Sequence, residues 1–128
     1  MGKYWIFIGA LFALLSVATG AFGAHALATR LEPRAVEIWQ TASHYQMYHA
    51  LGLIAVGILY WFMPAVSLNV AGWCFTLGVI LFSGSLYTLS FTGIKKLGMI
   101  TPFGGMLFLV GWGALLVWAW KASLDRTT

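Results

Sequence analysis

Charged residues are scarce in this sequence. Asp, Glu, Lys and Arg make up 8% of the 128 residues, and three of the charged residues are acidic. Soluble domains carry about 25% charged residues, so too little polar surface is present to cover a water-soluble globule. The shortage excludes an ordinary soluble fold, and a hydrophobic share of 61% favours a membrane protein.

Cysteine and acidic residues are too few for several kinds of site. Cys74 is the single cysteine, which excludes an intramolecular disulfide or a thiolate cluster. Glu32, Glu37 and Asp125 all lie outside the long apolar runs. No carboxylate is therefore available in a span to complete a zinc site or to orient a catalytic base. We expect no metal site and no catalytic residue.

Four long apolar runs are present, each close to the roughly 20 residues that cross the hydrocarbon core of a bilayer. The predicted spans cover about residues 4–24, 45–63, 70–91 and 103–120. The first run is longer than the apolar core of a signal peptide, which favours a retained span over a cleaved one. The sequence predicts one all-α domain over residues 1–128, an integral membrane bundle of four transmembrane helices.

Residues 28–43, between the first two spans, contain two arginines and two of the three acidic residues. Pro33 suits the first turn of a helix, and Trp39 suits the headgroup level of a membrane. We expect an interfacial helix in this loop, which can run directly into the second span. Asn69 is expected to cap the third helix, and Thr101, followed by proline, the fourth.

Basic residues flank both ends of the predicted spans in similar numbers. The end with the termini has Lys3, Lys121 and Arg126. The opposite end has Arg30, Arg34, Lys95 and Lys96. Both termini are expected on one side, but these numbers do not decide which side under the positive-inside rule. The scattered charges also argue against nucleic acid as a partner.

Small residues indicate where the helices pack. Helices in lipid associate by close packing and hydrogen bonds, so a stripe of small residues predicts a contact face. On the first span, Ser16, Gly20 and Ala24 recur every four residues. The predicted packing positions are Ser16, Gly20, Gly23, Ala24, Gly52, Gly84, Gly104 and Gly105.

A cluster of polar side chains is expected near one membrane interface. If the first helix leaves the bilayer near Ala24 and the second enters near Tyr45, His25 and His49 lie close together. Such side chains either make structural hydrogen bonds or mark a ligand site, and both interpretations stay open. The candidate ligand-binding residues are His25, Tyr45, Gln46, His49, Ser83, Ser85, Tyr87 and Thr101.

No cofactor is expected. Haem held by His25 and His49 as axial ligands is a minor alternative, since imidazole binds haem iron and bundle interiors host such sites. His44 is five residues before His49, so the two rings do not share a helix face. His44 is instead expected at the headgroup level.

Four motifs, in order along the chain, resemble those of a known family. They are Gly20-Ala-Phe-Gly-Ala-His25-Ala, Trp39-x-Thr-Ala-x-x-Tyr-Gln-x-x-His49-Ala, Leu81-Phe-Ser-Gly-Ser-Leu-Tyr87 and Thr101-Pro-x-Gly-Gly105. Over essentially its whole length, the chain is similar to the domain of unknown function 423 family, or uncharacterised protein family 0382, and to the transmembrane protein 256 group. The resemblance implies a four-span protein of the bacterial cytoplasmic (inner) membrane, with cytoplasmic termini, and it implies no activity.

The expected role is that of a small non-enzymatic membrane protein that associates with itself or with a larger membrane complex. Its stripes of small residues favour this interpretation. The alternative is binding or transport of a small amphipathic ligand (a lipid, quinone or weak acid) at the polar cluster. No Lys, Arg, Asp or Glu lies within a predicted span, which argues against ion-coupled pumping.

Overall fold

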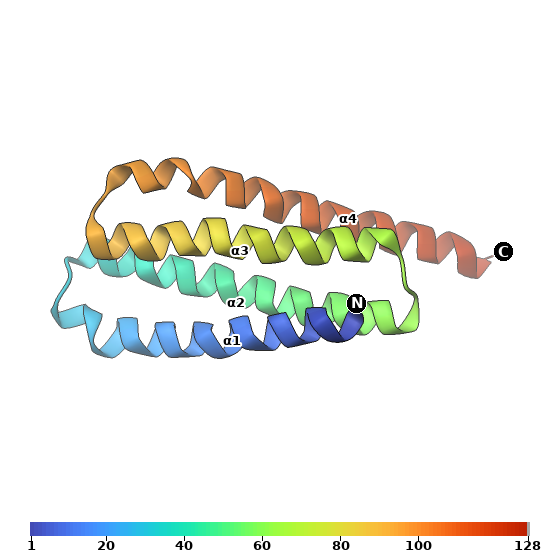
Figure 1. The fold of residues 1–128 in the computed structure, drawn as a ribbon, viewed down its shortest axis with the longest axis horizontal. Helices are drawn as coiled ribbons and strands as arrows, with labels where there is room; N and C mark the ends of the chain where they lie inside the picture. Colours follow the sequence, from blue (N-terminus) through green and yellow to red (C-terminus); the bar gives the residue numbers. More distant parts are fainter. Residues whose placement is uncertain (128) are drawn as a thin grey trace.

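The computed structural model describes residues 1–127, with side chains described through residue 124, and this part of the chain is all-helical. The side chains of Asp125 and Arg126 thus lie outside the described residues. Four long helices run up and down beside one another, and both ends of the chain lie at the same end of the molecule (Figure 1). They are α1 (Gly2–His25), α2 (Pro33–Phe62), α3 (Val66–Thr92) and α4 (Thr101–Thr127). Two short 3-10 helices, η1 (Leu27–Thr29) and η2 (Lys95–Met99), lie in the first and third connections.

Three helical segments are long and apolar enough to cross a membrane. They are Gly2–Thr29, Val66–Thr92 and Lys95–Leu124. α2 has 30 residues, which is also long enough, but Gln46 and His49 lie near its middle and lower its hydropathy. The all-helical fold class is thus confirmed, and three of the four predicted spans meet the criteria of length and composition.

The expected interfacial helix is not a separate element. A helix does begin at Pro33, but it continues to Phe62 without a break because no proline interrupts it. The residues predicted to lie along the interface form the first turns of α2 instead. The end of α1 is therefore level with the start of α2, and not with Tyr45.

Asn69 does not cap α3. That helix begins earlier, at Val66, after Ala65 in an extended conformation. The Asn69 side-chain oxygen accepts a hydrogen bond from Trp5 Nε1 at 3.0 Å. Thr101 also reaches another helix, because its hydroxyl lies 2.6 Å from Ser85 Oγ on α3. Both polar residues at the starts of helices thus tie two helices together.

α1 and α2 pack through a ladder of small residues with a seven-residue period. Its pairs are Gly2 with Gly57, Gly9 with Ala50, and Ser16 with Ser43. A Cβ atom at Gly9 would lie 2.7 Å from the Ala50 carbonyl oxygen. Ser16 and Ser43 each donate to the other's carbonyl, at 2.7 and 2.9 Å. The two backbones therefore approach closely, which maximises dispersion contacts between helices in lipid.

The predicted packing positions divide into two groups. Those that lie against a neighbouring helix are Ser16, Gly20, Gly23, Gly52 and Gly104. Ala24 is exposed, because the contact face of α1 follows a seven-residue period and not the four-residue period expected. No neighbouring atom lies within 4 Å of a Cβ placed at Gly84 or Gly105, so neither glycine lies at a close contact between helices of the described chain.

Trp5 is the largest fully buried side chain, 1% exposed, and it wedges α1 against α3. A Cβ atom at Gly72 would lie 2.4 Å from its indole, so glycine is required there for this packing. Around it the core contains Leu53, Val56, Leu68, Ala71, Phe75, Val79 and Phe108. α1 packs mainly on α2, α2 on α3, and α3 on α4. α2 and α4 face each other along a lateral seam, where Trp112 of α4 donates a hydrogen bond to His49 of α2.

Candidate functional site

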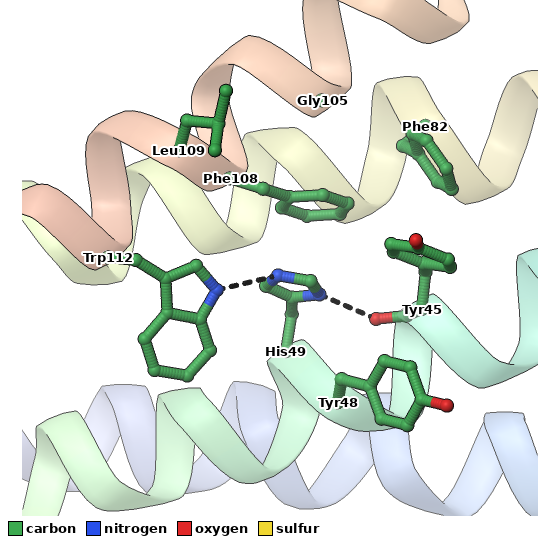
Figure 2. A pocket seen from close by; sticks show the side chains of 8 residues that line it. All are labelled: Tyr45, Tyr48, His49, Phe82, Gly105, Phe108, Leu109 and Trp112. Atoms are coloured by element: carbon green, nitrogen blue, oxygen red, sulfur yellow. Dashed lines mark hydrogen bonds between the residues drawn. The ribbon is translucent and has the colours of Figure 1, made fainter.

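A cavity of about 470 Å³ opens along the seam between α2 and α4. Its lining residues are Tyr45, Tyr48 and His49 of α2, Phe82 of α3, and Gly105, Phe108, Leu109 and Trp112 of α4 (Figure 2). We call this cavity the aromatic groove. Most of its lining side chains carry rings and none carries a formal charge. Its mostly apolar wall with a few polar groups is typical of a small-molecule site.

Helical spacing explains how these side chains meet. Tyr48 and His49 follow Tyr45 by three and four residues, so both lie on the side of α2 that Tyr45 faces. On α4, Gly105 precedes Phe108 by three residues, and Trp112 follows four residues later. Because glycine has no side chain, the space beside Phe108 stays open. A Cβ atom at Gly105 would meet no neighbouring atom within 4 Å.

His49 is held at both nitrogens of its ring. Trp112 Nε1 donates to Nε2 at 3.0 Å, and Nδ1 lies 2.7 Å from the Tyr45 carbonyl oxygen. Since an indole nitrogen can only donate, Nε2 accepts, and Nδ1 carries the proton and donates to the carbonyl. Phe108 stacks on the same ring, with 3.5 Å between centroids. This neutral imidazole, 4% exposed, keeps no nitrogen free for a metal or haem iron.

His25 does not lie near His49. Continuing the α1–α2 ladder from the Ser16–Ser43 pair places His25 level with Arg34, in the first turn of α2. His49 is 15 residues further along α2, or about 22 Å at 1.5 Å per residue. The expected pairing of these histidines is wrong because α2 begins at Pro33 and not near Tyr45. This separation and the bonded ring of His49 also remove the haem ligand pair.

Gln46 and Tyr87 belong to a different polar group, inside the contact of α1, α2 and α3. Tyr87 donates to Gln46 Oε1 at 2.7 Å, and Gln46 Nε2 donates to the Phe12 carbonyl at 2.8 Å. The Thr19 hydroxyl lies 2.9 Å from the Tyr87 hydroxyl. These side chains span three helices and satisfy one another, as buried polar groups must.

The three remaining candidates also bond other helices. Ser83 donates to the Ala42 carbonyl at 2.7 Å, and Ser85 pairs with Thr101 as described above. Among the described residues, Ser90 Oγ is the one buried side-chain polar atom without a partner. The interior polar groups predicted as ligand contacts are therefore used mainly in holding the helices together.

The hydroxyls of Tyr45 and Tyr48 are not used in this way. Within the described chain neither hydroxyl has a hydrogen-bond partner, and the two residues are 40% and 56% exposed. Their ring centroids are 5.7 Å apart, at one end of the aromatic groove (Figure 2). The groove thus combines an apolar wall with two free hydrogen-bond donors.

Sequence reasoning found Tyr45 and His49 but missed most of the groove. Tyr48, Phe82, Phe108, Leu109 and Trp112 were not predicted as site residues. A signal was present on the last helix, where Gly105, Phe108 and Trp112 follow one another at spacings of three and four residues. An aromatic stripe beside a glycine on one helix face indicates such a hollow only when the facing helix is known.

The helices, the apolar surface and the uncharged groove define a helical integral membrane protein. The family model for DUF423, described as "Protein of unknown function", matches residues 19–105, and the chain belongs to this family. The chain is 48% identical over 119 residues to a UPF0382 membrane protein of Staphylococcus haemolyticus, covering 93% of this chain and 97% of that relative. It is 46% identical over 120 residues to UPF0382 membrane protein YwdK of Bacillus subtilis, covering 93% and 98%. No solved structure matches the chain. The resemblance seen in the four motifs is thereby confirmed.

Proposed function

We propose that this protein is a non-enzymatic membrane protein with four spans that binds a small amphipathic ligand in the aromatic groove. One observation carries the proposal: two partnerless tyrosine hydroxyls lie at one end of an apolar, ring-lined groove. The rings can pack against an apolar body while the hydroxyls donate to a polar end. The sequence predicts ligand binding as the alternative role. The groove and its free hydroxyls favour that role over self-association.

We propose that α2 crosses the membrane, so that the tyrosine end of the groove lies near a membrane interface. Residues 42–62 of α2 are 21 residues, which at 1.5 Å per residue extend about 30 Å, the thickness of the hydrocarbon core. The charged residues Arg34 and Glu37 then lie outside the core. Tyr45 and Tyr48 lie about 5 and 9 Å inside it. Tyrosine is favoured at this depth, and the polar end of an amphipathic ligand lies there too.

The polar groups that line the groove are suited to binding a ligand and not to catalysing a reaction. Both nitrogens of His49 are bonded, and no carboxylate lines the groove to orient a base. Among the described residues, no group of three His, Cys, Asp or Glu side chains is placed to hold a metal ion. The groups that remain free can bind and orient a ligand but have no partner for proton transfer. We place both termini on the cytoplasmic side of the inner membrane, as the family resemblance implies.

Photo-crosslinking in native membranes tests the proposal. A photoreactive amino acid at Leu109, which lines the groove and is 69% exposed, is expected to capture one defined amphiphile, identified by mass spectrometry. The control position is Leu14, 65% exposed on α1 and outside the cavities described here. It is expected to capture the bulk lipid mixture. The same mixture at both positions would contradict ligand binding.

Self-association or membership of a larger membrane complex is the second candidate, and Gly84 favours it. A helical glycine costs about 1 kcal/mol relative to alanine, yet a Cβ atom placed at Gly84 would meet no neighbouring atom within 4 Å, so no packing within the described chain requires glycine there. In spans, small residues of this kind allow another helix to come close. A photoreactive residue at the neighbouring Ile80, 54% exposed, would then capture a second copy or another protein. Capture of bulk lipid alone would count against this candidate.

A further inference from the structure

A second apolar cavity adjoins the aromatic groove. This cavity, of about 450 Å³, is lined by Leu59, Trp112, Leu115, Leu116, Trp118 and Ala119. Trp112 lines both cavities, so they adjoin at its side chain, and we call the two cavities together the path along the seam between α2 and α4. From Tyr45 to Leu59 the path covers 14 residues of α2, or about 21 Å. An occupant of the whole path needs a long apolar tail.

The rings in the aromatic groove are nearly parallel. The planes of Tyr45 and His49 differ by 12°, those of His49 and Phe108 by 8°, and those of Tyr45 and Phe108 by 16°. Aromatic rings favour offset stacking with other flat rings. A flat ring entering the groove can extend this set, whereas a tetrahedral headgroup such as a phosphate cannot. The geometry thus favours a planar ligand head.

The hydrogen-bonding groups specify the chemistry of that head. Tyr45 and Tyr48 offer free hydroxyls, which suit acceptor oxygens such as carbonyls. No Lys or Arg lines either cavity, and an uncompensated carboxylate or phosphate is costly inside the hydrocarbon. The head is therefore neutral and accepts hydrogen bonds.

We infer that the ligand is a neutral planar ring with carbonyl oxygens and a long apolar tail, the chemistry of a membrane quinone. This inference rests on the proposed function and adds the class of ligand. The ring lies against Tyr45 and Phe108, its carbonyl accepts from the tyrosine hydroxyls, and the tail follows Leu109 and Trp112 toward Leu59. The inference concerns binding alone and includes no electron transfer.

The test compares three probes that each carry a ten-carbon chain, which in the acid includes the carboxyl carbon. They are a decyl-substituted benzoquinone, decylbenzene and decanoic acid, added to the full chain in lipid nanodiscs. Binding is followed by the shift in thermal unfolding. The quinone is expected to bind more tightly than the other two probes. Replacing both tyrosines (Tyr45→Phe with Tyr48→Phe) removes two hydrogen bonds and keeps the rings, so quinone affinity is expected to fall about tenfold while decylbenzene affinity is unchanged.

Two glycine variants separate failure of the inference from failure of the proposed function. Gly105→Phe fills the groove, and Gly113→Phe makes the same change on the same helix, where a Cβ also meets no atom within 4 Å. If the protein binds decanoic acid more tightly than the quinone, and only Gly105→Phe abolishes this binding, the quinone class is overturned. The groove would then remain a binding site. Equal quinone affinity in the wild type and the double tyrosine variant would also overturn the class. Equal binding of every probe by the two glycine variants would overturn the proposed function itself.

Discussion

Replacing Trp5 with alanine is expected to lower the free energy of unfolding by about 3–5 kcal/mol, the usual cost of removing a buried tryptophan. Trp5 is 1% exposed, packs on the bare backbone of Gly72, and donates a hydrogen bond to Asn69. Its loss removes the wedge between α1 and α3 and leaves a cavity that neither helix can close alone. Equilibrium unfolding in detergent micelles, followed by circular dichroism, measures the change.

Two further variants serve as controls for the Trp5→Ala measurement. Trp120→Ala removes the same side chain from a position that is 70% exposed, and it is expected to change stability by less than about 1 kcal/mol. Gly72→Leu should destabilise the wild type, because its Cβ meets the indole, but not the Trp5→Ala variant. Equal losses from Trp5→Ala and Trp120→Ala would contradict the central place of Trp5 in the core.

Replacing Gly9 with leucine is expected to destabilise the protein by about 3 kcal/mol, at the upper end of the usual cost of overpacking. The new Cβ would lie 2.7 Å from the Ala50 carbonyl oxygen and 3.0 Å from the Ile54 backbone nitrogen. Backbone atoms of a packed helix cannot turn away as a flexible side chain can. α1 and α2 must therefore separate along the ladder. The same unfolding measurement reports the loss.

Gly113→Leu is the matched control for this change. Gly113 is also a helical glycine, but no neighbouring atom lies within 4 Å of its Cβ position. Leucine favours the helix over glycine, so a gain of up to about 1 kcal/mol is expected there. If Gly9→Leu were as stable as Gly113→Leu, the close contact of α1 with α2 would be contradicted.

Hydropathy predicted the helices well because it is a local property of the sequence. The first predicted span, residues 4–24, differs from α1 by two residues at its start and one at its end. The helix start at Pro33 was predicted, but the membrane span was placed from residue 45, and hydropathy alone did not decide whether the two helical segments are continuous. The packing period of α1 was missed. Several small residues lie on that helix, and only the position of α2 decides which of them are covered.

Helix rotation explains why the predicted polar cluster divides in two. Tyr45 and Gln46 are adjacent in the sequence, but neighbouring residues point about 100° apart around a helix. Tyr45 therefore faces the groove beside α4, while Gln46 faces Tyr87 and the Phe12 carbonyl inside the bundle. The helical pattern could place Tyr45 and His49 on one face. It could not show that the partner across that face is Trp112, 63 residues away.

The claim that the aromatic groove holds an amphipathic ligand is tested most directly by native mass spectrometry of protein released from its own membranes. The wild type and the Gly113→Phe variant are expected to carry a bound small molecule of one defined mass. The Gly105→Phe variant is expected to carry at least tenfold less, because the new ring occupies the space beside Phe108. Equal amounts of that molecule on all three proteins, or none on the wild type, would contradict the claim.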